Sequence, residues 1–261
     1  MPLLESIGMS FTSLSTGGFV LNDNFYTNDL QLWILCALML IGSISFIAHN
    51  KLMQRKFKAF LTSFEKNIFL LILLAAMGLA FYALHDIRLV IFEVISAFTT
   101  TGYSITPISM LPHLFIMVIM IGMVFGGNIA STAGGMKVFR IFALVKAIPW
   151  LLRKLSLPSR AIIPFKIRGK PFDEKSLLIM QIFVSCYIGF LVIGTFIFLL
   201  LGHSFLDSAF QVTSALGTVG LQTIELINVH WIGKLTLVLA MILGRLEIFP
   251  LLVLVRKIVR G

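Results

Sequence analysis

A short polar pattern centred on glycine occurs three times in this otherwise apolar chain, and it restricts the possible folds more than any other feature. Each glycine follows a threonine by two positions and a small hydroxyl residue by six, and a bulky apolar or aromatic residue comes next. The members are Thr12, Thr16, Gly18 and Phe19; Ser96, Thr100, Gly102 and Tyr103; and Ser214, Thr218, Gly220 and Leu221. Such self-similarity indicates an internal structural repeat. We call residues 15–19, 99–103 and 217–221 the first, second and third Thr–Gly loops.

Long apolar runs separate the loops and indicate a membrane protein. Hydrophobic residues make up 58% of the chain and charged residues 12%, whereas soluble domains average about 45–50% and about 25%. The mean hydropathy is +1.00. The runs approach the roughly 20 residues that a helix needs to cross about 30 Å of hydrocarbon. We expect an all-α integral membrane protein of repeated units. The expected spanning helices are 30–49, 63–84, 176–201, 231–259, and 111–147 with an interruption at 126–135.

The cations are unevenly distributed about these helices. If the Thr–Gly loops face outward, 16 of the 21 lysines and arginines belong to the inner side, and only Arg88 and Lys234 fall outside. The 16 are Lys51, Arg55, Lys56, Lys58, Lys66, Lys146, Arg153, Lys154, Arg160, Lys166, Arg168, Lys170, Lys175, Arg256, Lys257 and Arg260. The positive-inside rule therefore predicts a multi-pass protein with its Thr–Gly loops outside and its C-terminus in the cytoplasm. The net charge of +10 then reports loops beside anionic lipid, not a nucleic-acid surface.

The segment before each loop is too short to cross the membrane. The helices on either side of a loop run in opposite directions, so the loop and its lead-in begin and end on the outer side. The second and third lead-ins, residues 91–98 and 206–216, must therefore enter the membrane and return. Such backbone is tolerated only where it is buried in protein or lines a watery cavity. Each unit is predicted to contain a membrane helix, a re-entrant pore helix, an extended loop and a second membrane helix.

A Thr–x–Gly loop at the end of a pore helix suits a dehydrated cation. Consecutive backbone carbonyls can replace its water, and glycine permits the φ values that turn them to one side. Threonine adds a hydroxyl oxygen, and the negative end of the helix dipole favours positive charge. Anion selectivity would call for lysine or arginine at the mouth, and none occurs in the three loops. One such loop would be an ordinary turn, but three aligned copies favour an ion pathway.

Residues 126–135, which we call the glycine-rich loop, interrupt an apolar helix with four glycines and several short polar residues that disfavour helix. A phosphate-binding P-loop is excluded, because Lys137 is followed by Val138 and no strand precedes the segment. Close helix packing over small residues remains an alternative. Arg245 is also unusual, because a charge within an apolar helix marks an ion path or a buried pair.

Together these features resemble the Trk/Ktr/HKT superfamily of potassium transporters, and most closely its bacterial TrkH type. The resemblance runs through essentially the whole chain. It is most specific at residues 126–137 and in Gly244-Arg245-Leu246-Glu247-Ile248-Phe249-Pro250. It implies potassium uptake across the bacterial cytoplasmic (inner) membrane through a pore with a backbone-carbonyl selectivity filter. It also implies a homodimer in the lipid bilayer, a cytoplasmic nucleotide-binding regulatory subunit, K+ as the transported ion and no organic cofactor in this chain.

The resemblance assigns roles to particular residues. The expected filter comprises Ser15, Thr16, Gly17, Gly18, Phe19, Thr99, Thr100, Thr101, Gly102, Tyr103, Gly217, Thr218, Val219, Gly220 and Leu221. K+ is expected at Thr16, Gly17, Thr100, Thr101, Thr218 and Val219. The expected gate is an intramembrane loop under the filter, made of Gly126, Gly127, Asn128, Ser131, Thr132, Gly134 and Gly135, with Arg245 beside it. Lys137 and Arg140 are expected only to snorkel towards the cytoplasm.

Family members have four helix–pore-loop–helix units, whereas this sequence shows three loops. The glycines are 84 and 118 residues apart, and a fourth loop 84 residues before Gly18 would fall before Met1. We expect the end of unit two at residues 1–58, unit three at 59–148, a basic cytoplasmic linker at 149–175 and unit four at 176–261. The first unit and a half would be absent, and three quarters of a filter cannot enclose an ion.

Two alternatives to a potassium-conducting pore subunit remain at this point. One is an ion-coupled secondary transporter with a substrate site at the broken helix. The other is a truncated, non-conducting fragment that needs the missing N-terminal part. An enzyme is not expected, because no nucleophile, base and acid form a recognisable set. The sequence leaves open K+ versus Na+ selectivity, channel-like versus ion-coupled transport, and the identity of the regulatory partner.

Overall fold

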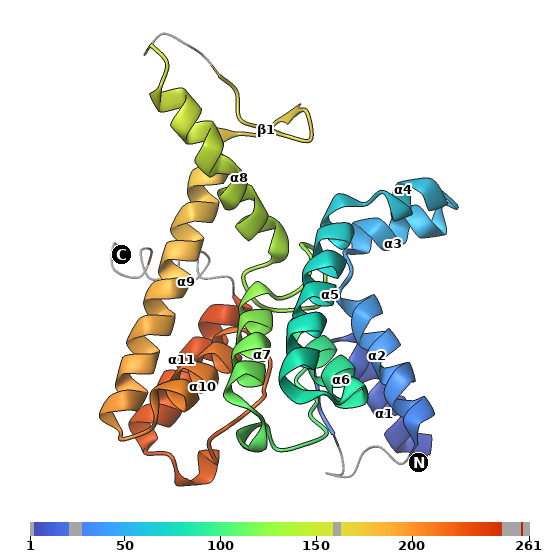
Figure 1. The fold of residues 1–261 in the computed structure, drawn as a ribbon, viewed down its shortest axis with the longest axis vertical. Helices are drawn as coiled ribbons and strands as arrows, with labels where there is room; N and C mark the ends of the chain where they lie inside the picture. Colours follow the sequence, from blue (N-terminus) through green and yellow to red (C-terminus); the bar gives the residue numbers. More distant parts are fainter. Residues whose placement is uncertain (1–2, 21–27, 159–162, 247–256, 258–261) are drawn as a thin grey trace.

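A computed structural model of the chain describes residues 3–20, 28–158, 163–246 and 257. The described part is almost entirely helical, as expected for an all-α membrane protein (Figure 1). The helices are α1 (Leu3–Leu14), α2 (Asp29–Ser43), α3 (Phe46–Met53), α4 (Phe57–Leu61), α5 (Phe64–Leu84), α6 (Ile87–Phe98), α7 (His113–Phe125), α8 (Val138–Leu155), α9 (Glu174–Leu200), α10 (Phe205–Leu216) and α11 (Trp231–Arg245). Two 3-10 turns, η1 (Ile108–Met110) and η2 (Leu226–Asn228), and a hairpin of β1 (Lys166–Ile167) and β2 (Lys170–Pro171) complete the described elements.

The three sequence repeats fold into three units with the same boundaries. The helices α1, α6 and α10 have 12 residues each; every one begins 15 residues before its glycine and ends four residues before it. The helices α2, α7 and α11 each begin 11 residues after the glycine and pack against the short helix of their own unit. Twelve residues cannot span a membrane. The short helix α10 is buried over residues 208–216, as a re-entrant segment requires.

Two longer helices stand beside the second and third units. The helix α5 has 21 residues and α9 has 27, and both are long and apolar enough to cross a membrane. In Figure 1, α5 lies against α6 and α7, and α9 lies against α10 and α11. The spanning helices expected at 63–84 and 176–201 are therefore confirmed. The interruption of the third crossing is confirmed as well, because α7 ends at Phe125 and α8 begins at Val138.

The prediction of one continuous helix over residues 30–49 is wrong, because the chain bends by 100° between α2 and α3. In an unbroken helix the Phe46 amide would donate to the carbonyl of Gly42. It donates instead to the carbonyl of Ala130, at 2.8 Å, and Thr132 donates to the carbonyl of Gly42. The glycine-rich loop thus replaces the helix's own hydrogen bonds at the bend.

Two helix ends also differ from the prediction. The helix α8 continues through Pro149 to Leu155, although the sequence predicts a linker from residue 149. On this extension Trp150 donates from Nε1 to the carbonyl of Ile163, at 3.1 Å, so tertiary contacts hold the helix past the proline. The helix α11 ends at Arg245, short of the predicted residue 259. Residues 247–256 of that prediction lie outside the described residues.

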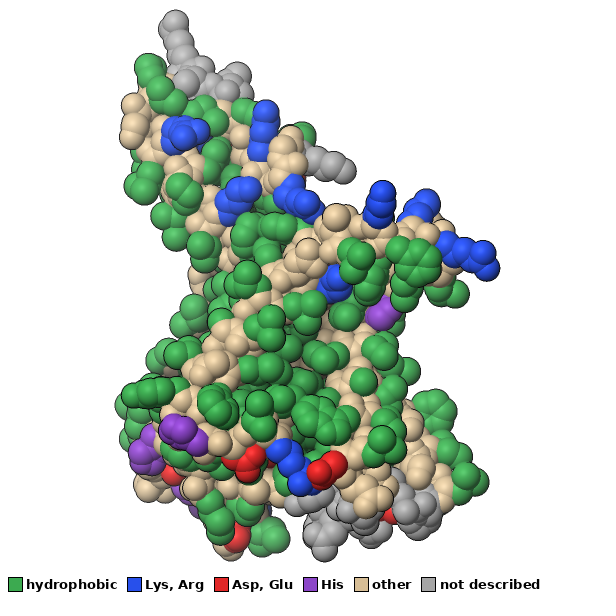
Figure 2. All heavy atoms as spheres, turned by 45° about the vertical axis from the view of Figure 1, so that its right-hand side comes forward, with side chains coloured by type: hydrophobic (Ala, Val, Ile, Leu, Met, Phe, Trp, Pro, Cys, Tyr) green, Lys and Arg blue, Asp and Glu red, His purple; other side chains and the backbone are tan. Residues whose placement is uncertain are grey.

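Charged side chains gather at opposite ends of the molecule. In Figure 2 the lysines and arginines cluster at the end that α3, α4, α8 and the hairpin form in Figure 1. The acidic and histidine side chains visible in that view lie at the other end. Arg88, at the start of α6, forms an ion pair with Asp29. The cations that the sequence assigns to inner loops therefore share one end of the described structure.

Candidate functional site

The three Thr–Gly loops share one backbone conformation. The threonine before each glycine has a positive φ, of 52° at Thr16, 56° at Thr100 and 54° at Thr218. The glycines also have positive φ values, from 66° to 98°, whereas the residue between threonine and glycine does not. Positive φ is rare for a β-branched residue, and such strain clusters at functional sites. Residues of alternating hand turn successive carbonyl oxygens to one side, as a dehydrated cation requires.

The amide groups of each loop point back into its short helix. In the second loop the amides of Thr100 and Thr101 donate to the carbonyls of Ala97 and Ser96, at 3.1 and 2.9 Å. The first and third loops make the same pair of bonds. No described residue donates a hydrogen bond to the carbonyls at these two positions, which are those of Thr16, Gly17, Thr100, Thr101, Thr218 and Val219. These oxygens are available to a cation.

The small hydroxyl residue six positions before each glycine ties the helix to the outgoing strand. Ser96 Oγ donates to the carbonyl of Tyr103, at 2.6 Å, and Thr12 Oγ1 donates to the carbonyl of Phe19, at 3.2 Å. In the third unit Ser214 Oγ accepts a hydrogen bond from the amide of Gly220, at 3.1 Å. The repeated hydroxyl in the sequence therefore has a structural role: it holds the loop at a fixed distance from its helix.

The loops lie side by side, and each close approach requires a glycine. A Cβ atom on Gly18 would lie 1.9 Å from the carbonyl oxygen of Thr101, and one on Gly102 would lie 1.9 Å from that of Val219. The first loop therefore abuts the second in the same way as the second abuts the third. The equivalent position on Gly220 has no described atom within 4 Å. The three loops are thus successive members of a ring that is open beside Gly220.

The glycine-rich loop contacts the threonine of every Thr–Gly loop. Thr16 Oγ1 donates to Thr132 Oγ1 at 3.2 Å, and the amide of Gly134 donates to Thr100 Oγ1 at 2.6 Å. A Cβ atom on Gly134 would lie 2.4 Å from Thr218 Oγ1. The sequence predicts a segment under the three loops, and these contacts bring its Thr132 and Gly134 against all three of them.

The other residues expected in the gate fold the glycine-rich loop onto itself. Asn128 is fully buried, and Ser131 Oγ donates to its carbonyl at 2.6 Å. A Cβ atom on Gly135 would lie 2.8 Å from the Cα atom of Gly126, and one on Gly127 would lie 2.5 Å from that of Ala133 Cβ. These approaches explain why glycine occupies both ends of the segment.

Two cations near the loop differ in their surroundings. Lys137 is only 8% exposed, and its Nζ donates to the carbonyl of Ala133, so the expectation that it snorkels is wrong. Burial lets the ammonium satisfy a carbonyl of the glycine-rich loop. Arg245 is exposed and forms no hydrogen bond with the described residues of that loop. Its neighbour Glu247 lies outside the described residues, and the gating role of Arg245 stays a prediction.

Sequence reasoning missed two sets of residues at this site. The first set is a glycine 24 residues after each loop glycine, at the end of the returning helix: Gly42, Gly126 and Gly244. A Cβ atom on Gly42 would lie 2.2 Å from the carbonyl oxygen of Leu14, and one on Gly244 would lie 2.0 Å from that of Leu216. Extending the repeat alignment would have found them. The second set is Glu93 and Gln211, whose types differ and which no shared letter marks.

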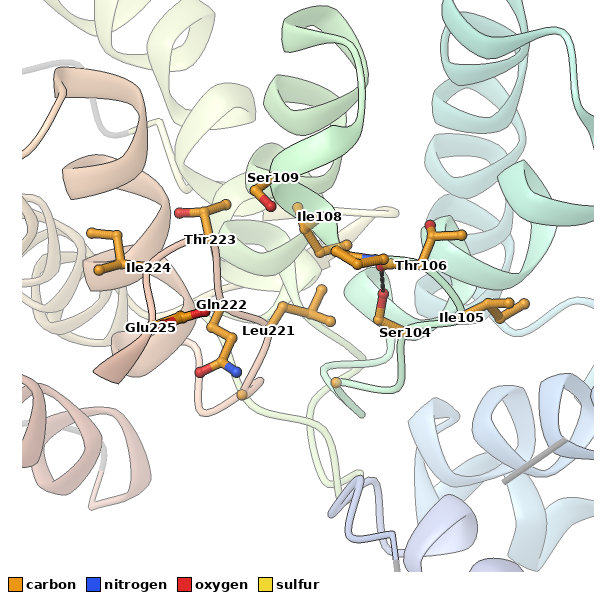
Figure 3. Close-up of a pocket in the computed structure, with 13 residues that line it drawn as sticks. Ser104, Ile105, Thr106, Ile108, Ser109, Leu221, Gln222, Thr223, Ile224 and Glu225 are labelled. Atoms are coloured by element: carbon orange, nitrogen blue, oxygen red, sulfur yellow. Dashed lines mark hydrogen bonds between the residues drawn. The ribbon is translucent and has the colours of Figure 1, made fainter. Parts of the chain in front are cut away.

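A cavity of about 500 Å³ opens between the outgoing strands of the second and third loops (Figure 3). Its walls are residues 104–109 and 220–225, together with Gly102. Ser104 Oγ donates to the carbonyl of Thr106 in one wall, and Gln222 and Glu225 belong to the other. The cavity adjoins the glycines of both loops and is a route by which an ion can reach them. In the described part of the chain, no cluster of histidine, cysteine or acidic residues could hold a metal ion.

Apolar crossing helices, short buried helices and loops with free carbonyls define a helical membrane transport protein. Residues 82–260 match the TrkH family, described as cation transport protein. The chain therefore belongs to the TrkH family, and the resemblance identified in the sequence is confirmed.

Relatives in this family have the names of cation and potassium transporters. The uncharacterized cation transporter MJ1485 of Methanocaldococcus jannaschii is 27% identical over 96% of this chain and 53% of its own length. The Trk system potassium uptake protein TrkG of Escherichia coli K12 is 28% identical over 97% of this chain and 56% of its own. The crystal structure of the potassium transporter TrkH from Vibrio parahaemolyticus superposes with a TM-score of 0.80 at 25% identity, covering 97% of this chain and 58% of that one. This chain spans about half the length of the relatives that it matches.

Proposed function

We propose that the chain forms part of a potassium pathway through the cytoplasmic membrane, in which the three Thr–Gly loops are three parts of the selectivity filter. The observation that carries the proposal is the shared loop geometry, with positive φ at threonine and glycine and carbonyls that no described residue bonds. The names of relatives such as TrkG support K+ as the transported ion. The bound ions lie at Thr16, Gly17, Thr100, Thr101, Thr218 and Val219.

The electrostatics of the loops suit a cation. The C-terminal ends of α1, α6 and α10 lead directly into the loops, and this end of a helix dipole is negative. The loops contain no lysine or arginine that would repel the ion. Backbone carbonyls held in place by the helix–strand hydrogen bonds replace the water that the ion loses on entry.

The glycine-rich loop is the gate of this pathway. Its contacts with Thr16, Thr100 and Thr218 support a position directly beneath the filter, where it obstructs the passage. Each neutral hydrogen bond that holds it contributes roughly 0.5–1.5 kcal/mol. Displacing the loop therefore requires only a few kcal/mol, which a regulatory partner that binds the open form better can supply.

A fourth Thr–Gly loop completes the filter, and residues outside those described here contribute it. The open side of Gly220 supports its position, because Gly18 and Gly102 each have the carbonyl of the next loop at that place. The carbonyl of Gly17 is the matching free surface at the other end of the row.

The cationic end of the molecule faces the cytoplasm, and the Thr–Gly loops face outward. The segregation of charge in Figure 2 supports this orientation through the positive-inside rule. The protein works as a homodimer with a cytoplasmic nucleotide-binding subunit, as the resemblance to its family implies. Exposed Lys56 and Lys58 at this end offer charges to such a partner.

The proposal is tested by growth of a potassium-uptake-deficient bacterial strain at low K+. The chain is expressed alone and also fused to the part of Escherichia coli TrkG that it does not match. We expect the fusion to restore growth and the chain alone to fail. A membrane-inserted fusion that does not restore growth, or that takes up Na+ as fast as K+ in proteoliposomes, would contradict the proposal.

A further inference from the structure

We propose that Glu93 and Gln211 are positioning residues that fix the outer end of the selectivity filter in the second and third units; this rests on the proposed function. Both residues stand nine positions before the loop glycine. Both accept a hydrogen bond from the amide three positions after that glycine, where the strand leaves the filter. The same connection is thus built twice from two different side chains.

The geometry is best defined in the second unit. Glu93 is fully buried in α6, and its Oε1 accepts from the amide of Ile105 at 2.7 Å and from Ser104 Oγ at 2.9 Å. In the third unit Gln211 is 5% exposed, and its Oε1 accepts from the amide of Thr223 at 3.4 Å. A buried acceptor that bonds a strand amide costs less than one left without a partner, so the pairing defines a single strand position.

Each of these helices holds its outgoing strand at two levels. The hydroxyl six positions before the glycine bonds the strand at or next to the glycine, as Ser96 does at the carbonyl of Tyr103. The acceptor nine positions before it bonds the strand one helical turn farther out, as Glu93 does at Ile105. Two bonds set both the distance and the angle of the strand, and with them the direction of its carbonyls. A binding site must hold its groups within about 0.5 Å of the productive geometry.

The first unit uses a different device. Its residue at the equivalent position is Met9, which has no strong acceptor in its side chain. Met9 is buried, and its sulfur lies 3.7 Å from the hydroxyl of Tyr103. Tyr103 Oη also lies 2.5 Å from Thr12 Oγ1, which links the second loop to the short helix of the first unit.

The comparison of units separates reach from charge. Glutamate and glutamine have the same length and both present an oxygen at the same place, but only glutamate can carry a charge. Glu93 Oε2 has no hydrogen-bond partner among the described residues, and Glu93 forms no ion pair among them. The third unit makes its bond with a neutral amide. An oxygen at the correct distance is therefore what the strand requires, and a negative charge is not.

The experiment compares substitutions that separate these two properties, in the transport-competent form that the growth assay identifies. Glu93→Gln keeps the reach and removes the charge, whereas Glu93→Asp keeps the charge and shortens the reach. We expect the K+-over-Na+ uptake ratio in proteoliposomes to stay near wild type in Glu93→Gln and to fall about tenfold in Glu93→Asp, because one hydrogen bond is lost. Gln211→Glu and Gln211→Asn repeat the comparison in the third unit. Thr195→Val, which removes a buried hydroxyl from α9, is the control for a general loss of packing.

A second measurement tests the same bonds without transport. Hydrogen exchange at the amide of Ile105 is expected to be about tenfold faster in Glu93→Asp than in wild type and unchanged in Glu93→Gln. This result would stand even if the wild-type protein did not prefer K+, in which case the proposed function alone would fail. An impaired Glu93→Gln beside a normal Glu93→Asp would overturn the inference, and so would wild-type behaviour of both. If Glu93→Asp does not fold, the Gln211 pair decides by the same criteria.

Discussion

The backbone amide of Gly134 donates a hydrogen bond to Thr100 Oγ1 at 2.6 Å, so the glycine-rich loop is fixed to the middle Thr–Gly loop. A hydroxyl oxygen has two acceptor lone pairs. In the proposed pathway the carbonyl of Thr100 binds K+ within the same residue. An ion that recruits this hydroxyl therefore competes with the Gly134 amide, and loop position and ion occupancy are linked. An ion can displace the loop only to the extent that it binds better when the loop is away.

Thr132→Val is expected to raise basal cation uptake through the transport-competent protein roughly two- to tenfold. The change preserves the shape of the side chain but removes the hydroxyl that donates to the carbonyl of Gly42 and lies 3.2 Å from Thr16 Oγ1. Losing such a bond costs about 0.5–1.5 kcal/mol and favours the displaced loop by that amount. Uptake of rubidium into proteoliposomes measures the effect. Thr132→Ser retains the hydroxyl and should match wild type; an equal rise in both variants would contradict the gating role of the bond.

Gly134→Ala is expected to force the glycine-rich loop away from the third Thr–Gly loop and to raise basal uptake. The new Cβ atom would lie 2.2 Å from the carbonyl oxygen of Gly217 and 2.4 Å from Thr218 Oγ1. Overpacking of this kind costs about 1–3 kcal/mol, and the loop can relieve it by moving. Gly78→Ala in α5 is the matched control, because nothing lies within 4 Å of its Cβ position. Wild-type uptake in a folded Gly134→Ala protein would show that the loop does not rest against the filter.

Much of the fold follows from the three-fold repeat, because its spacing is kept in the structure. The short helices end four residues before Gly18, Gly102 and Gly220, and the threonine two positions before each glycine adopts the same positive φ. Local chemistry is sufficient for these features, since glycine, a small hydroxyl residue and an apolar face are visible in the sequence. The bend between α2 and α3 is different. It depends on a hydrogen bond from Phe46 to Ala130, which lies 84 residues away and which no local pattern reveals.

The site itself was predictable where one residue type does one job in every unit. The free carbonyls belong to the residues that the family resemblance assigns to K+ binding, because the backbone follows the repeated threonine and glycine. Glu93 and Gln211 escaped notice because the repeat conserves their acceptor oxygen and not their identity. Their partners, Ile105 and Thr223, contribute only backbone amides, whose positions no side-chain pattern reports.

The open side of Gly220 predicts different costs for the same substitution in equivalent glycines. Gly102→Ala places a Cβ atom 1.9 Å from the carbonyl oxygen of Val219, whereas Gly220→Ala meets nothing within 4 Å. Both carry the strain of positive φ, about 1–2 kcal/mol. In the chain alone, thermal unfolding in detergent should show Gly102→Ala less stable than Gly220→Ala by a further 1–3 kcal/mol or so, about the cost of overpacking.

In the transport-competent form that difference should vanish, because the fourth loop then occupies the space beside Gly220. Gly220→Ala is therefore expected to abolish K+-selective uptake as completely as Gly102→Ala. Gly78→Ala again provides the control, since it adds a methyl group to a helix without a neighbour. Equal destabilisation of the chain alone by the two substitutions would contradict the open ring.

Arg245→Ala is expected to raise leak through the completed pathway. Arg245 stands 25 residues after Gly220, in register with Ser43 and Gly127 of the other two units. Ser43 accepts the amide of Asn128 from the glycine-rich loop, and Gly127 belongs to that loop. The register therefore puts Arg245 at the level of the gate. A guanidinium there opposes the passage of cations, because charges interact strongly where water is scarce.

The measurement is basal rubidium uptake with no regulatory partner present. Arg245→Ala should increase it, and Arg245→Lys should not, since it retains the positive charge. Lys234→Ala serves as the control, because Lys234 is an exposed cation near the start of the same helix and donates to the carbonyl of Ile227, far from the glycine-rich loop. Equal increases in Arg245→Ala and Arg245→Lys would assign the effect to the guanidinium's hydrogen bonds and not to its charge. Unchanged uptake in Arg245→Ala would remove Arg245 from the gate.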